Sequence, residues 1–188
     1  VNMLDSIKSI MNLKSIDKDI AENNFDLALD KLNALIKEDY KPSLTYLKRG
    51  QLCKKLLMTD DAYSDFTYII THCANKREAY FERAFLNFEI SNYDQAILDV
   101  NKVLVWDKDN FDLKRILILS LIYSKQDLIA RDYLMKIFDN SVYKAIQFLF
   151  NEVAKVLAKD EYARGLRILE IIDNIDKDNP IKIFKEAT

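Results

Sequence analysis

Apolar residues recur at intervals of three and four along most of the chain, which is the spacing of one face of an α-helix. The chain holds only 2 Gly and 2 Pro, whereas strands joined by tight turns need such residues and helix interiors exclude them. The pattern therefore predicts an all-α fold. We expect helices near residues 4–22, 25–38, 43–57, 60–73, 77–90, 93–106, 110–124, 127–139, 142–159 and 162–175, with a closing helix at 180–187.

A repeat of 34 residues underlies this helical pattern. The clearest markers are four alanines on one period, Ala28, Ala62, Ala96 and Ala130. Other positions follow the same period: Tyr46-x-x-Arg49-Gly50 returns as Tyr80-x-x-Arg83-Ala84, Asp60 as Asp94, and Asp65 as Asp99. A fixed period of this length is typical of helical repeat proteins, in which stacked neighbours bury a continuous core.

The repeat resembles the tetratricopeptide family, most closely in the segment 91–97, Ser-Asn-Tyr-Asp-Gln-Ala-Ile. The resemblance implies a right-handed superhelical solenoid of antiparallel helix pairs, about 10–11 helices in all, with a small residue where paired helices approach. We expect one solenoid over 1–188, with repeats at about 10–41, 42–75, 76–109, 110–140 and 141–178 before the closing helix at 180–187.

The first, fourth and fifth repeats depart from the family pattern. Ile16 and Ile118 stand where the small residue of the first helix is expected. In the fifth repeat Gly165 takes the place of the alanine, 35 residues after Ala130, so the register slips by one. Irregular repeats at the two ends are consistent with terminal repeats that shield a stack.

Charge and hydropathy exclude two classes of partner. The net charge is −2, with acidic and basic residues intermixed and no basic stripe, which argues against nucleic acid. No apolar run reaches the roughly 18 residues that a membrane helix needs. The compartment is only weakly constrained by these features, and we favour the cytoplasm.

Candidate catalytic chemistry is scarce. His72 is the only histidine, and Cys53 and Cys73 have neither the spacing of a metal pair nor that of a disulfide framework. A glycine-rich phosphate loop cannot be built from Gly50 and Gly165 alone. We expect no enzymatic activity, no catalytic residue, no metal site and no cofactor.

In the tetratricopeptide family the first helix of each repeat lines the concave surface, and the resemblance carries this role to particular residues here. The expected partner-binding residues are Phe81, Phe85, Phe88, Leu47, Gln51, Lys55, Arg115, Leu119 and Ile122. Phe81, Phe85 and Phe88 share one helical face. Two interpretations remain open for them: a groove that accepts an amphipathic helix or extended peptide, or core packing under a neighbouring segment.

The resemblance also allows one specific role to be checked. Family members that hold the acidic C-termini of chaperones use Lys, Asn and Arg at fixed places, where this chain has Leu13, Asp17, Gln51, Glu78 and Glu82. That role is therefore disfavoured. The sequence favours a scaffold or adaptor that binds another protein, with a regulatory or docking module of a larger enzyme or secretion machinery as the alternative. A homo-oligomer is compatible with both.

Overall fold

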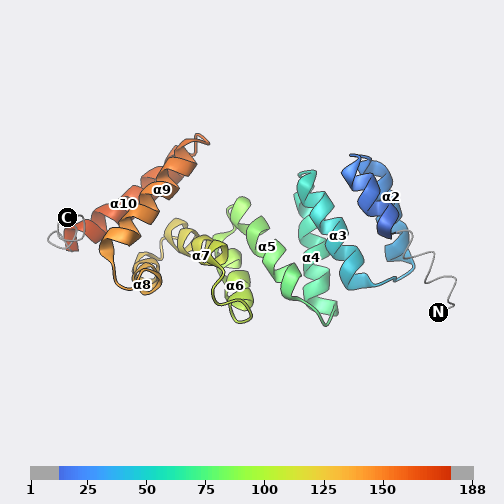
Figure 1. The fold of residues 1–188 in the computed structure, drawn as a ribbon, viewed down its shortest axis with the longest axis horizontal. Helices are drawn as coiled ribbons and strands as arrows, with labels where there is room; N and C mark the ends of the chain where they lie inside the picture. Colours follow the sequence, from blue (N-terminus) through green and yellow to red (C-terminus); the bar gives the residue numbers. More distant parts are fainter. Residues whose placement is uncertain (1–12, 179–188) are drawn as a thin grey trace. The chain divides into compact units, whose positions relative to one another are not determined.

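The protein is described here by a computed structural model that covers residues 13–178. Residues 13–21 are helical, and further helices follow one another through short turns (Figure 1). Their bounds are α2 Phe25–Lys37, α3 Pro42–Lys55, α4 Thr59–His72, α5 Arg77–Glu89, α6 Tyr93–Leu104, α7 Phe111–Tyr123, α8 Asp127–Ile137, α9 Val142–Leu157 and α10 Tyr162–Asp178. The all-α prediction is confirmed for these residues.

The helix boundaries lie close to those predicted from the sequence. From α2 onwards every helix begins within one residue of its expected start, and the last helix continues beyond the expected residue 175 to Asp178. The expected closing helix at 180–187 and the expected residues 4–12 of the first helix lie outside the described residues. Within the described residues, no helix is both long and apolar enough to cross a membrane.

The chain divides into two compact bodies. Among the described residues, the N-terminal body comprises 13–90 with 102–108, and the C-terminal body comprises 91–101 with 109–178. In the N-terminal body α2, α3, α4 and α5 pack in sequence, and α3 also contacts α5. In the C-terminal body α7, α8, α9 and α10 pack in sequence, and α10 also contacts α7 and α8.

Small residues mark the places where paired helices approach. Ala28, Ala62, Ala96 and Ala130 are all fully buried, as their period predicts. Gly50 on α3 lies against Phe66 on α4, and a Cβ atom built at Gly50 would stand 2.6 Å from Phe66 Cε1. Phe66 is itself fully buried, so its ring has little room to move away from an added methyl group.

A buried ion pair joins the same two helices. Arg49 donates from Nε and Nη2 to the two carboxylate oxygens of Asp65, at 2.9 and 2.6 Å, and from Nη1 to Asn33 Oδ1 at 2.7 Å. The Asp65 side chain is only 2% exposed. A buried carboxylate such as Asp65 requires a partner of this kind, and the two residue types of the pair return in the sequence as Arg83 and Asp99.

The turn inside each helix pair contains one residue in the left-handed conformation. Asn23, Leu57, Ser91 and Lys125 have φ between 60° and 64° and lie 34 residues apart. After Leu57 the turn is closed by the Met58 amide, which donates to Cys53 O at 2.9 Å, as in a Schellman motif. In the fifth repeat the left-handed residue is Asp160, 35 residues after Lys125, so the slip seen at Gly165 is already present at the turn.

We predict that Gly50→Ala lowers the free energy of unfolding by about 1–3 kcal/mol, because overpacking against Phe66 outweighs the gain of about 1 kcal/mol in helix propensity. Urea unfolding followed by helical circular dichroism measures the change.

Gly165→Ala is the matched control. There a Cβ atom would meet Leu157 Cδ2 at 3.2 Å, and Leu157 is 41% exposed and free to shift. Equal destabilisation by the two substitutions would contradict the packing explanation.

Candidate protein-binding surface

In the N-terminal body, the first helices of the second and third repeats are held side by side by Glu82. This carboxylate on α5 accepts hydrogen bonds from Gln51 Nε2 at 2.8 Å and from Lys54 Nζ at 2.5 Å, both on α3. The Glu82 side chain is 15% exposed. Its two bonds fix the spacing of α3 and α5 and so define a shared face, which we call the α3/α5 face.

A hollow of about 470 Å³ lies at the beginning of α3 and α5. Leu47, which the repeat register assigned to the concave surface, lines it together with Leu44 and Glu78. Its other lining residues come from the start of α3 and from the α4–α5 connection: Lys41, Pro42, Ser43, His72, Cys73, Ala74 and Asn75. The hollow is therefore lined mainly by apolar and uncharged groups, with one acid and one base among them.

One wall of the hollow is braced by stacked rings. His72 stacks on Tyr68 with ring centroids 4.5 Å apart, and Tyr68 stacks on Tyr46 at 3.9 Å. From the sequence, His72 was considered only as a catalytic candidate and was not connected with Leu47. The four-residue spacing of Tyr68 and His72 on α4 was the available signal, because residues so spaced lie on one helical face.

The phenylalanine row lies further along the α3/α5 face. Phe81, Phe85 and Phe88 are all half-buried, and the rings of Phe81 and Phe85 are in contact, with centroids 4.7 Å apart. Leu47 is half-buried as well. These side chains thus keep part of their apolar surface accessible, in contrast to the fully buried core residues of the same body such as Phe66.

The two expected polar residues of α3 have different surroundings. Gln51 is exposed and takes part in the Glu82 bridge. Lys55 is also exposed, but its ammonium group lies 4.7 Å from the centroid of the Phe25 ring, at the start of α2. Lys55 therefore packs against the preceding helix.

The expected residues of α7 belong to the C-terminal body and are enclosed there. Leu119 is 1% exposed and Ile122 is fully buried. Arg115 donates from Nε to Glu152 Oε2 of α9 at 2.8 Å, and Lys155 Nζ donates to Glu152 Oε1 at 2.6 Å. In this conformation Leu119 and Ile122 offer no surface to a partner, and we leave them out of the proposed site.

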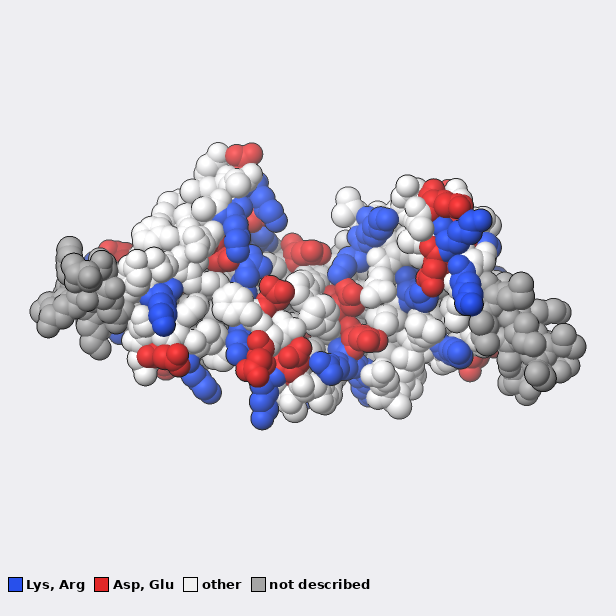
Figure 2. Space-filling view, viewed as in Figure 1, with Lys and Arg blue, Asp and Glu red and all other residues white. Residues whose placement is uncertain are grey.

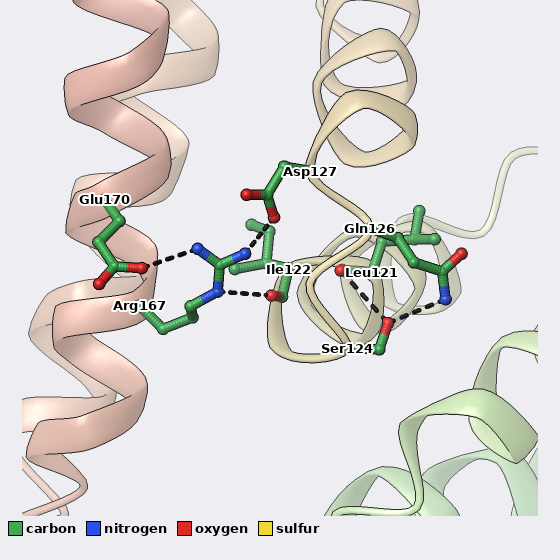
Figure 3. Close-up of polar contacts among 7 residues, drawn as sticks. All are labelled: Leu121, Ile122, Ser124, Gln126, Asp127, Arg167 and Glu170. Atoms are coloured by element: carbon green, nitrogen blue, oxygen red, sulfur yellow. Dashed lines mark hydrogen bonds and ion pairs between the residues drawn. The ribbon is translucent and has the colours of Figure 1, made fainter.

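Helix α10 covers the end of α7 through Arg167 (Figure 3). Its guanidinium donates from Nε to Ile122 O at 3.0 Å, from Nη1 to Glu170 at 2.8 Å and from Nη2 to Asp127, the first residue of α8. A cation at the last carbonyls of a helix is stabilising because it opposes the negative end of the helix dipole. Nothing in the sequence distinguishes Arg167 from the other charged residues, so this contact could not be predicted.

Arg164 makes a second attachment one turn earlier on α10. It donates from Nε to Tyr93 Oη at 3.1 Å and from Nη2 to Ser91 Oγ at 2.9 Å, and its guanidinium lies 5.6 Å from the Tyr123 ring centroid. The hydrogen bonds from Arg164 to Ser91 and Tyr93, at the start of α6, span more than seventy residues of sequence. Periodicity carries no signal for them.

Reactive groups are sparse in the described structure. Among residues 13–178, no three His, Cys, Asp or Glu side chains gather in a way that could hold a metal ion. Cys53 and Cys73 are both free thiols, Cys53 buried and Cys73 partly exposed beside the hollow. Burial raises the pKa of the Cys53 thiol to about 11, which keeps it protonated near neutral pH.

The two thiols should differ in reactivity. We predict that iodoacetamide at neutral pH alkylates Cys73 while Cys53 stays unmodified, because Cys53 is buried and protonated. Peptide mass spectrometry measures both rates. Comparable rates on the folded chain would contradict the described packing of α3.

The Glu152 carboxylate should make the C-terminal body sensitive to acid. Burial alone would raise its pKa, but the hydrogen bonds and charges of Arg115 and Lys155 outweigh this and hold the pKa below 4.5. A lowered pKa stabilises the folded state above the ordinary pKa, and this stabilisation is lost as the pH falls through the folded value. We predict that Glu152→Gln costs about 1–3 kcal/mol at pH 7.

The same substitution should cost progressively less below pH 4.5. Urea unfolding at a series of pH values measures the difference between the native chain and the variant. A difference that stays constant from neutral to acidic pH would contradict this role for the carboxylate.

Comparisons with known proteins bear on the fold. No protein-family profile matches the chain. A stretch of 95 residues is 24% identical to human sperm-associated antigen 1, and it covers 50% of this chain but only 10% of that protein.

Solved structures match over nearly the whole length. MamA from Desulfovibrio magneticus RS-1, residues 41 to the end, superposes with a TM-score of 0.65 at 13% identity, over 92% of this chain and 97% of that one. YrrB, described as a TPR protein with an unusual peptide-binding site, superposes with a TM-score of 0.63 at 10% identity, over 94% and 91%. The chain therefore has the fold of the tetratricopeptide-repeat proteins, as its 34-residue period predicts.

Proposed function

We propose that the chain is a protein-binding module that holds a peptide or an amphipathic helix against the α3/α5 face. The observation that carries this proposal is the half-buried row of Phe81, Phe85 and Phe88 on α5, the helix whose first turn, at Glu78, lines a hollow of about 470 Å³. A partly accessible apolar row on rigid helices is the kind of surface that accepts side chains spaced three and four residues apart.

The polar groups on this face favour a partner with mainly apolar contacts. Glu82 accepts hydrogen bonds from Gln51 and Lys54. The charges of Glu82 and Lys54 at the centre of the face therefore neutralise each other. Binding would therefore depend chiefly on apolar burial, with a weak dependence on salt. YrrB, which shares the fold, is described as having a peptide-binding site, and this agrees with the proposal.

A second candidate is a docking module within a larger enzyme or secretion machinery. One observation favours it: the matching stretch in sperm-associated antigen 1 makes up one tenth of that protein. The two candidates differ in what surrounds the chain in the cell. Mass spectrometry of the polypeptide that an antibody against the chain captures would find an enzyme or secretion-machinery domain in the same polypeptide for a built-in module, and none for a free adaptor.

We predict that a Phe81→Glu/Phe85→Glu double variant stays folded and loses a specific protein that the native chain retains from source lysate. Loss of a buried aromatic anchor typically weakens binding by about 2 kcal/mol or more. Affinity capture with quantitative mass spectrometry, together with helical circular dichroism and the melting temperature, measures both effects.

A Leu27→Glu/Val105→Glu double variant serves as the matched control. These residues are 47% and 67% exposed in the same body and lie on neither α3 nor α5, so the control should retain the partner. Unfolding of the Phe81→Glu/Phe85→Glu variant would assign the row to the core. Retention of the partner by a folded variant would move the binding site elsewhere.

A further inference from the structure

The outer side of the last helix pair is unusually apolar. Five large apolar side chains are exposed there: Phe150 at 51% and Leu157 at 41% on α9, and Tyr162 at 60%, Leu166 at 63% and Leu169 at 38% on α10. The spacing of the α10 residues, by four and three, places them in one row along the helix. We call these five residues the α9/α10 face.

This face points away from the rest of the C-terminal body. On α9, Phe148 and Glu152 point toward α7 and α8, where they meet Phe111, Phe138 and Arg115. On α10, Arg164 and Arg167 point the same way. At 100° per residue the exposed row of each helix lies on the other side of the pair.

The two rows adjoin because α9 and α10 approach closely. Gly165 on α10 packs against Leu157 and Val156 of α9, with only 3.2 Å between its ideal Cβ position and Leu157 Cδ2. Figure 2 shows a broad area without charged side chains over this helix pair. A contiguous apolar patch of this kind is uncommon on a monomeric protein unless it is an interface.

We infer that a second copy of this chain occupies the α9/α10 face, in a symmetric dimer in which the two α10 helices lie antiparallel. A twofold axis at Leu166 brings Leu166 against its own counterpart. It also places Leu169 opposite Ala163, an exposed small residue that leaves room for the leucine. Self-complementarity of this kind is what a twofold interface requires.

The size of the face is sufficient for a specific dimer. If each of the five side chains contributes on the order of 100 Å², two copies together bury roughly 1,000 Å², the lower limit for a specific interface. This inference is independent of the proposed function, because the α9/α10 face lies in the C-terminal body and the α3/α5 face in the N-terminal body.

Sedimentation equilibrium of the full chain from about 1 to 200 µM tests the dimer. The native chain should reach twice its mass of 22.0 kDa. Leu166→Glu should weaken dimerisation by a factor of ten or more, because it places like charges on the twofold axis. Leu166 is 63% exposed, so helical circular dichroism should be unchanged.

Leu128→Glu is the control, since Leu128 is 78% exposed on α8 and outside the face. A native chain that stays monomeric, or a dimer that Leu166→Glu does not weaken, would overturn the inference.

Discussion

The close approach of paired helices is the constraint on which the other features of this chain depend. It requires a side chain no larger than a methyl group at Ala28, Ala62, Ala96 and Ala130, all fully buried, and none at all at Gly50 against Phe66. Because neighbouring helix axes are fixed in this way, the remaining surface of each first helix is held in place relative to its paired second helix. The α3/α5 face exists because α3 and α5 are held by the same second helix, α4.

Buried ion pairs add specificity to this packing. Arg49 and Asp65 join α3 to α4 in one body, and Arg115 and Glu152 join α7 to α9 in the other. An unpaired charge at either place would be costly, so each pair allows one register of its two helices and disfavours others. The first pair recurs with the repeat period in the sequence, whereas the second has no counterpart there.

How much of the structure could be predicted from the sequence depends on how far apart in the chain the interacting residues lie. Periodicity and turn residues are local signals, and they located the helices and the buried alanines closely. Helix α10 covers the end of α7, where Arg167 donates to Ile122 O and Arg164 lies against the Tyr123 ring, across more than forty residues of chain. No local pattern reports such packing, and so the enclosure of Leu119 and Ile122 could not be predicted from the sequence.

The left-handed turn residues have a consequence for how this chain can change over evolutionary time. Leu57 and Lys125 hold a conformation that favours glycine, at a strain of roughly 1 kcal/mol each. Both turns recur at fixed intervals and lie outside the α3/α5 face. The thermal stability of the chain can therefore evolve through single substitutions in the turns between helices. Selection can act separately on the helix residues that would bind a partner.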